Sequence, residues 1–296
     1  MSELPWSRTA VKQAVALAGP RAAVRHISAL VGGTHSRTYL IQVSNPELEV
    51  VLREFPAGDA AACQEAQVLT ALDGLGGLAP RLLASGPGGT PPAGPWNLIS
   101  RLPGAADITP ASPSAFAAQL GETLARIHGA PQTELIRLSS VFDGSGGFLE
   151  ALSGPAASLV AARQDCLSSA PRVLTHYDFW SGNTLWRDGT LTGVVDWSGG
   201  AVGPRGFDVG WCRLDLYLLY DQDIADCFLN AYQAASGNTM TGSLLSDLWA
   251  VARSYQYVES WVPNYHDLRR SDLTAAELRK RHTQWSRYLI GQSKAG

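Results

Sequence analysis

The alternation of apolar and polar residues predicts β-structure in the first third of the chain and helices in most of the remainder. Residues 26–43 contain two β-rich runs on either side of a glycine turn, the pattern of a β-hairpin, and residues 48–55 form a third apolar run. Residues 63–72 place apolar side chains at helical spacing. Residues 86–95 are too rich in Gly and Pro for a helix or a strand, so they predict a turn between two strands, the second of them at 95–102.

Helical spacing dominates after residue 103. Residues 114–130 place Phe116, Leu120, Leu124 and Ile127 on one stripe of a helix. Three later helices are predicted near residues 212–235, 243–262 and 274–290. The segment at residues 173–197 lies between the helix at 114–130 and these three. It predicts short strands joined by a polar loop and by an Asp188-Gly189 turn.

This pattern predicts an α+β chain with two lobes. A small β-rich lobe is expected at residues 1–102 and a larger helical lobe at residues 103–296, with the boundary at Pro103-Gly104. A chain of 296 residues is long enough for two lobes that share one cleft. Hydrophobic residues make up 45% of the chain and charged residues 17%, which is typical of a folded globular protein.

The net charge and the cysteine content indicate which classes of binding partner and which cellular compartment to expect. The net charge of -3 argues against nucleic acid and against an anionic membrane, because both favour basic surfaces. No apolar run reaches about 18 residues, so no transmembrane helix is expected. The first twenty residues lack the features of a secretory signal, and the four cysteines are scattered, so we expect a cytoplasmic protein. The oligomeric state does not follow from the sequence.

A group of polar residues in the segment 173–197 has the spacing of a catalytic loop. His176 and Asp178 precede Asn183, and Asp196 follows Asn183 by thirteen residues. Phosphoryl transfer requires an acceptor hydroxyl held in line with the γ-phosphate, and metal ions that neutralise the phosphates. Asp178 is suited to accept the hydroxyl proton, whereas Asn183 and Asp196 offer the hard oxygen ligands that Mg²⁺ prefers. His176 is expected to fix the loop through hydrogen bonds.

The sequence also excludes several other enzyme classes. It contains no G-x-x-x-x-G-K-[ST] motif, which rules out a Walker-type nucleotide site. It contains neither an H-E-x-x-H helix nor a G-x-S-x-G elbow, so nothing indicates a metalloprotease or an α/β-hydrolase. Alone, the H-x-D-x-x-x-x-N motif is weak evidence for a kinase-like catalytic loop. The evidence becomes stronger because Asp196, Asp208 and the glycine hairpin occur with it.

The motifs HYDFWSGN, VVDW and GFD resemble the signature of the aminoglycoside phosphotransferase and choline kinase superfamily, distant relatives of protein kinases. The similarity extends over most of the chain and includes VVLREF, EAQVLTAL, NLISRLPG and LGETLARIHGA. It implies a two-lobed, protein-kinase-like fold. It also implies a small-molecule kinase that transfers the γ-phosphate of ATP or GTP, with Mg²⁺, to the hydroxyl of an aminoglycoside-like compound, an amino alcohol or a sugar.

The resemblance assigns roles to individual residues. Asp178 would be the catalytic aspartate, Asn183 and Asp196 the metal ligands, and Asp208 with His176 the support of the catalytic loop. The backbone of residues 98–102 would receive the adenine. The nucleotide-binding set that it implies is Gly32, Gly33, Thr34, Ser36, Arg53, Glu65, Ser100 and Leu102.

Two positions depart from the family pattern. Tyr177 stands between the histidine and the aspartate, where the family usually has glycine. Arg53 stands where kinases have a lysine that contacts the α- and β-phosphates, and we expect it to pair with Glu65. Arginine carries the same charge and binds phosphate in a bidentate manner, but it is bulkier than lysine.

The acceptor is not specified by any motif, and several alternatives stay open. The Phe179–Gly182 segment is similar to fructosamine kinases, so a fructosamine- or choline-type kinase is the first alternative. A catalytically silent, nucleotide-binding regulator is the second, because of Arg53. The acidic residues of 207–232 either attract a cationic substrate or form a solvated helix face. The aromatic residues of the helical lobe either form a substrate pocket or belong to the core.

Overall fold

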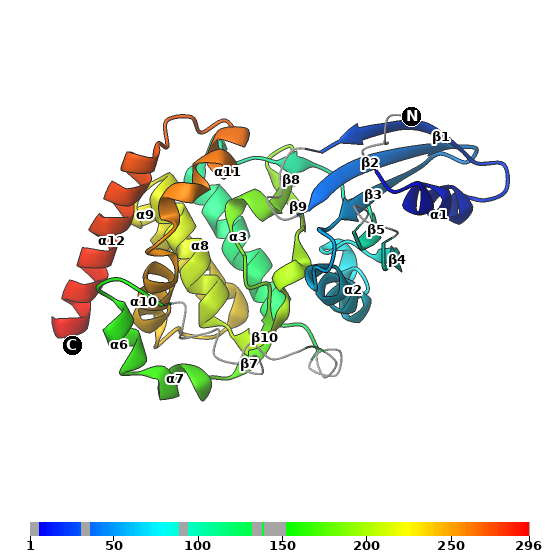
Figure 1. Ribbon diagram of the computed structural model, residues 1–296. Helices are drawn as coiled ribbons and strands as arrows, with labels where there is room; N and C mark the ends of the chain where they lie inside the picture. The colour runs from blue at the N-terminus through cyan, green and yellow to red at the C-terminus, as the bar shows by residue number, and fades with distance from the viewer. Residues whose placement is uncertain (1–5, 31–35, 89–93, 132–137, 139–151, 296) are drawn as a thin grey trace. The chain divides into compact units, whose positions relative to one another are not determined.

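The structure is a computed structural model that describes residues 6–30, 36–88, 94–131, 138 and 152–295 (Figure 1). The chain divides into two compact units. Unit 1 comprises Met1–Pro103 and Gly193–Gly199, and unit 2 comprises Gly104–Thr192 and Gly200–Gly296. The sequence had placed residues 193–199 in the second lobe. The structure instead includes them in unit 1, and Asp196 with them.

Unit 1 is built on a five-stranded antiparallel sheet with the strand order β1-β2-β3-β5-β4. Its strands are β1 (Ala23–Ala29), β2 (Arg37–Ser44), β3 (Leu48–Glu54), β4 (Leu82–Gly86) and β5 (Trp96–Ser100). Its helices are α1 (Arg8–Ala18) and α2 (Ala61–Leu72), followed by the 3₁₀ turn η1 (Leu75–Gly77). The predicted hairpin therefore forms between β1 and β2.

The helix α1 was not predicted from the sequence, which had indicated a single helix in this part of the chain. Ser7 caps its N-terminus by accepting a hydrogen bond from the N–H of Ala10. Ala10 and Ala14 lie one turn apart and are fully buried against the core of the sheet. The buried face of this helix therefore consists of small side chains.

Unit 2 is mainly helical. Its longer helices are α3 (Pro113–His128), α8 (Gly206–Leu219), α9 (Gln222–Ser236), α10 (Ser243–Ser254) and α12 (Ala275–Ala295). Its shorter helical segments are α6 (Ala157–Ala161), α7 (Gln164–Ser168), η2 (Ser181–Asn183), η4 (Val258–Trp261) and α11 (Val262–Asp267). The helix predicted near 212–235 is in fact two helices, because Asp221 caps a new one at α9.

Two small sheets complete unit 2 and lie before and after the predicted catalytic loop in the sequence. One pairs β7 (Arg172–Thr175) with β10 (Ala201–Pro204), and the other has the order β6-β8-β9. These last strands are β6 (Ala105–Ala106), β8 (Thr184–Arg187) and β9 (Thr190–Val194). The short strands predicted for 173–197 are thus present, with Asp188 and Gly189 at positive φ in the turn between β8 and β9. The strand β10 was not predicted.

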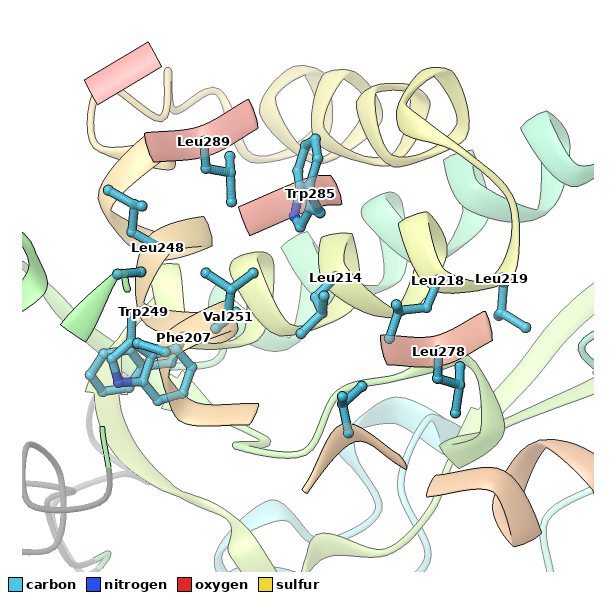
Figure 2. Packing of buried hydrophobic residues seen from close by; sticks show 14 of the residues in the cluster. Phe207, Leu214, Leu218, Leu219, Leu248, Trp249, Val251, Leu278, Trp285 and Leu289 are labelled. Atoms are coloured by element: carbon cyan, nitrogen blue, oxygen red, sulfur yellow. The ribbon is translucent and has the colours of Figure 1, made fainter. Parts of the chain in front are cut away.

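The core of unit 2 forms where α8, α10 and α12 pack together (Figure 2). Leu214 and Leu218 of α8, Leu248 and Val251 of α10, and Trp285 of α12 belong to one cluster of buried residues. The backbones of α8 and α10 approach closely at Gly210, where a Cβ atom would lie 2.3 Å from the carbonyl oxygen of Ser246. Only glycine allows this approach.

A buried carboxylate in this core predicts a pH dependence of stability. Asp247 is 2% exposed and pairs with Arg213 at 3.1 Å, and burial raises the pKa of Asp247 to about 7. Since the folded protein then binds a proton that the unfolded chain has lost, stability should fall as the pH rises from about 4 to 7. The upper limit of this loss is about 4 kcal/mol.

Asp247→Asn should remove that pH dependence, because asparagine does not titrate. Urea denaturation of both proteins at pH 4.5 and pH 8 measures the effect. We expect the variant to gain stability relative to the wild type at pH 8, so the difference between its free energy of unfolding and that of the wild type should be larger at pH 8 than at pH 4.5. Parallel profiles for the two proteins would show that Asp247 is already ionised when the protein is at pH 4.5.

No helix among the described residues is long and apolar enough to cross a membrane.

Candidate functional site

The loop after β7 in unit 2 is anchored by Asp208, a fully buried residue in the first turn of α8. The backbone N–H groups of His176 and Tyr177 each donate a hydrogen bond of 2.7 Å to its carboxylate. Nε2 of His128 lies 3.1 Å from the same carboxylate. One buried carboxylate therefore fixes the two residues that precede Asp178.

His128 completes this anchor as a neutral ring. Burial lowers the pKa of His128, although Asp208 opposes the shift. Nδ1 of His128 lies 2.8 Å from the hydroxyl of Tyr232. Because a carboxylate only accepts, Nε2 of His128 carries the proton that is donated to Asp208, and Nδ1 accepts from Tyr232. The histidine in this helix is therefore a structural link and not an acid or a base.

Tyr177 adopts a backbone conformation that explains the glycine usual at this position of the family. Its φ is 66°, in the left-handed region that glycine occupies without strain. A tyrosine there costs about 1–2 kcal/mol. The hydrogen bond from its N–H to Asp208 offsets part of this cost, and so does the packing of its ring against Phe207.

The side chain of Asp178 is oriented by two donors. The indole Nε1 of Trp211 donates to Oδ1 of Asp178 at 3.0 Å. The amide nitrogen of Asn183 donates to Oδ2 at 3.1 Å and to the backbone carbonyl of Asp178 at 2.9 Å. Both carboxylate oxygens are thus fixed in direction, while the side chain remains half-buried and so partly accessible to solvent.

The second half of the loop is anchored by Asp215, two turns further along α8. Its Oδ2 accepts from the backbone N–H of Ser181 at 3.0 Å and from the hydroxyl of Ser181. Its Oδ1 accepts from the hydroxyl of Tyr265 at 2.9 Å. Burial raises the pKa of Asp215 to about 6, although these hydrogen bonds oppose the shift. Directly after Ser181, Gly182 packs so closely under Trp180 that a Cβ atom would lie 2.1 Å from its ring.

The supporting roles of Trp211 and Asp215 were not identified from the sequence. Asp208, Trp211 and Asp215 follow one another at spacings of three and four residues, so they form one stripe of α8. This stripe was the available signal, in a helix where Arg213 is the one other charged residue. Its meaning depends on the predicted catalytic loop, which meets that face only in the folded chain.

Unit 1 contains a second polar group, centred on Arg53 of β3. Nη1 of Arg53 lies 2.7 Å from Oε1 of Glu65 in α2, and Nη2 lies 2.8 Å from Oδ1 of Asp196. The hydroxyl of Ser36 lies 3.1 Å from Nη2. Arg53 is 5% exposed and Glu65 is 1% exposed, and Asn97 of β5 donates a further hydrogen bond of 3.0 Å to Glu65. The pairing of Arg53 with Glu65 that the sequence indicated is present.

Asp196 is held in unit 1 by more than Arg53. Its φ of 63° turns the chain sharply after β9. The hydroxyl of Ser198 donates to Oδ1 of Asp196 at 2.9 Å, and the N–H of Val194 donates to the carbonyl of Leu78 at 2.8 Å. The segment 193–199 is thereby joined to the rest of unit 1 on both sides of Asp196.

The other predicted nucleotide-binding residues fall into two groups. Gly32, Gly33 and Thr34 lie outside the described residues. Ser100 ends β5, where its hydroxyl accepts a hydrogen bond of 2.9 Å from the N–H of Arg81, and Leu102 packs against Gly193. These two residues thus have structural contacts in unit 1.

The two predicted metal ligands have donor atoms that fit magnesium. The amide nitrogen of Asn183 donates to Asp178, so the remaining polar atom of that side chain is a carbonyl oxygen. Asp196 supplies a carboxylate. Within the described part of the chain, no three His, Cys, Asp or Glu side chains cluster to hold a metal ion. Mg²⁺ bound by one or two protein oxygens, water and substrate phosphates does not need such a cluster.

Comparison with known proteins identifies the family to which the chain belongs. The sequence matches the model of the phosphotransferase enzyme family over residues 26–255. The chain belongs to this family. It is therefore an enzyme, a small-molecule kinase, and the family expected from HYDFWSGN, VVDW and GFD is confirmed. No protein of curated function matches this phosphotransferase.

Solved structures confirm the predicted α+β, protein-kinase-like class of the phosphotransferase. A thermostable mutant of aminoglycoside phosphotransferase APH(4)-Ia, in a complex with AMP-PNP and hygromycin B, is 18% identical with a TM-score of 0.61, and the match covers 95% of this chain and 98% of that one. Macrolide 2'-phosphotransferase MphH from Brachybacterium faecium is 18% identical with a TM-score of 0.54, covering 86% and 90%. Aminoglycoside-3'-phosphotransferase of type VIII is 17% identical with a TM-score of 0.56, covering 82% and 96%.

Proposed function

We propose that this phosphotransferase transfers the γ-phosphate of ATP or GTP, with Mg²⁺, to a hydroxyl group of a small molecule. The observation that carries the proposal is the carboxylate of Asp178, which Trp211 and Asn183 orient while its loop is fixed at both ends. A pre-oriented carboxylate on a rigid loop is what in-line transfer to a hydroxyl requires. The structural relative that is in a complex with AMP-PNP supports a nucleoside triphosphate as the donor.

In the proposed reaction, Asp178 accepts or orients the proton of the acceptor hydroxyl. The hydroxyl oxygen forms a bond to the γ-phosphorus, and the bond from that phosphorus to the β–γ bridging oxygen breaks. The products are a phosphate ester and a nucleoside diphosphate. The protein supplies position and charge, because phosphoryl transfer needs little covalent chemistry from the enzyme.

Asn183 and Asp196 are proposed as the protein ligands of Mg²⁺, which neutralises charge on the phosphates. Arg53 is proposed to fix Asp196, since the two side chains are joined in unit 1, and to add positive charge for the phosphates. The proposed set of nucleotide-binding residues remains Gly32, Gly33, Thr34, Ser36, Arg53, Glu65, Ser100 and Leu102. His176 and Asp208 are proposed as the support of the catalytic loop, and the protein is proposed to be cytoplasmic.

A thermal-shift experiment tests the nucleotide site without an acceptor. ATP and GTP, each with and without Mg²⁺, should raise the melting temperature through binding to the folded state. A ligand at a hundredfold excess over its Kd stabilises by about 2.7 kcal/mol, which corresponds to several degrees. The shift should depend on Mg²⁺, and Asp196→Asn should abolish that dependence. Asparagine suits this test because it tolerates the positive φ of residue 196.

A matched control is Asp73→Asn, which removes an exposed carboxylate of unit 1 at another residue of positive φ. This variant should retain the full shift. Arg53→Lys should keep part of the response, whereas Arg53→Met should lose it, because only the first keeps a cation beside Asp196. If neither nucleotide shifts the melting temperature of the wild type, the proposed donor is wrong.

A further inference from the structure

Four half-buried aromatic side chains of unit 2 gather next to Asp178, and we call them the aromatic surface: Tyr177, Trp211, Tyr257 and Trp261. The indole N–H of Trp211 donates a hydrogen bond to Asp178. The ring of Trp261 lies 5.3 Å from that of Trp211, and the ring of Tyr257 lies 5.8 Å from that of Trp261. Tyr177 adjoins Asp178 in the chain. Planar apolar side chains therefore flank the carboxylate that is proposed to receive the acceptor.

The aromatic surface rests on a rigid base. Phe207 and Trp249 stack with their ring centroids 4.4 Å apart, and both are fully buried at one end of the core cluster (Figure 2). The ring of Trp249 lies 6.1 Å from that of Tyr177 and 6.2 Å from that of Trp211. The two half-buried rings of Tyr177 and Trp211 are thus held in place by the core, as a binding surface requires.

Tyr177 has its ring here in spite of the backbone strain at residue 177. Glycine would remove that strain, and the two hydrogen bonds to Asp208 use only backbone N–H groups, which glycine also has. Strained residues cluster at functional sites, so the strain at residue 177 supports a function for its side chain beyond its packing against Phe207. The aromatic ring is the part of Tyr177 that glycine lacks.

A positive charge lies beside the aromatic surface. Arg253 follows Trp249 by four residues on α10, so the two side chains lie on the same face of that helix. Arg253 is half-buried, and no carboxylate among the described residues forms an ion pair with it. Burial raises the pKa of Tyr177 and of Tyr257, and the charge of Arg253 opposes the rise in both. Its guanidinium is therefore within electrostatic reach of both rings.

The carboxylates near this surface are already engaged by protein groups. Asp208 and Asp215 hold the catalytic loop, and Glu259 pairs with Arg279. Asp226 pairs with Arg213 at 2.6 Å, and Asp221 caps α9. Asp223 is the one acidic residue of 207–232 whose carboxylate none of these contacts engages, and it is exposed in the first turn of α9. These residues therefore form no continuous free acidic wall, and their contacts do not favour the attraction of a cationic substrate that they offered as one alternative.

We propose that the acceptor of this phosphotransferase is an alcohol that carries a planar apolar group and a carboxylate. The apolar group would pack on the aromatic surface, the carboxylate would pair with Arg253, and the hydroxyl would meet Asp178. The inference rests on the proposed function, because that function makes Asp178 the residue that receives the hydroxyl. It disfavours polycationic acceptors, since Arg253 would repel them.

The test compares aromatic alcohols of different charge. The anionic probes are mandelate, 3-phenyllactate and tropate, the neutral probes are their methyl esters, and the cationic probes are phenylglycinol and phenylalaninol. Binding to the full-length protein is measured by calorimetry without nucleotide. At least one anionic probe should bind more tightly than its ester and than either amine. Arg253→Gln should weaken that probe about ten- to hundredfold and leave the ester unchanged.

Arg287→Gln is the matched control, because it removes an exposed arginine of α12 with the same change in net charge. It should not change the affinity of any probe. Tyr177→Gly is a second variant that leaves the loop conformation available. Its melting temperature should change little, because the relieved backbone strain and the lost packing of the ring oppose each other, while the variant weakens the anionic probe and its ester together.

The outcomes separate this inference from the proposed function. Tighter binding of the amines, no binding of any anionic probe, or anionic binding that Arg253→Gln leaves unchanged would each overturn the inference, even if nucleotide still shifts the melting temperature. A different outcome is Arg253-dependent binding in a protein whose melting temperature neither nucleotide shifts. That outcome would support the site for an anionic aromatic ligand and overturn the proposed nucleoside triphosphate donor.

Discussion

Replacing Asp178 by asparagine is expected to lower kcat by about 10²- to 10⁴-fold, the range that a positioned general base contributes. Asparagine keeps the shape of the side chain and an oxygen that accepts from Trp211. It loses the negative charge that accepts or orients the hydroxyl proton. Because neither Asp208 nor Asp215 is altered, the loop should keep its conformation. Release of nucleoside diphosphate in the presence of an acceptor measures the effect.

The control for this variant is Asp188→Asn, which changes an exposed carboxylate in the β8–β9 turn. Asparagine is suited to the φ of 53° at that position, so turnover and stability should both remain at the wild-type level. Normal turnover by Asp178→Asn, with an unchanged melting temperature, would remove Asp178 from the reaction.

Replacing Asp208 by alanine is expected to have the largest effect on stability, a loss of about 3–5 kcal/mol in the free energy of unfolding. The substitution leaves the N–H groups of His176 and Tyr177 buried without an acceptor, and it removes the partner of His128. Tyr177 would also lose a contact that offsets its strained backbone. Urea denaturation at neutral pH gives the value.

Asp223→Ala serves as the comparison for Asp208→Ala, since Asp223 is an exposed carboxylate in the first turn of α9. Its effect should stay within about 0.5–1 kcal/mol, as for other exposed charges near a helix N-terminus. A loss for Asp208→Ala no larger than that of Asp223→Ala would mean that water replaces the buried carboxylate as the acceptor of these N–H groups.

The sequence was sufficient for elements whose apolar side chains are large and regularly spaced. The hairpin of β1 and β2, the strand β3 and the helices α2, α3 and α12 all follow from such spacing. The helix α1 was missed because its buried face consists of small alanines. The end of α8 and the start of α9 were not predicted, because Asp221 was considered only as one of several acidic residues. In the structure its side chain caps the N-terminus of α9.

The candidate site could be predicted as a set of residue types but not as a set of contacts. The spacing of His176, Asp178 and Asn183 indicated a catalytic loop before any geometry was known. The roles of Trp211 and Asp215 depend on the face of α8 that meets this loop. The positive φ of Tyr177 likewise could not be predicted from the presence of a tyrosine at that position. The periodicity of apolar residues predicts which face of a helix or strand is buried. It does not predict which residues of other elements that face contacts.

The segment Gly193–Gly199 has a consequence for how the protein is made. Residues 1–103 leave the ribosome first, but unit 1 lacks this segment until residues 104–192 have also been synthesised. In the interval, Arg53 has no Asp196 and the carbonyl of Leu78 has no N–H of Val194. The nascent N-terminal part therefore reaches its final set of contacts only after most of the chain has emerged. A gene cut at residue 103 yields an incomplete first unit, so the two units are unsuited to separate expression.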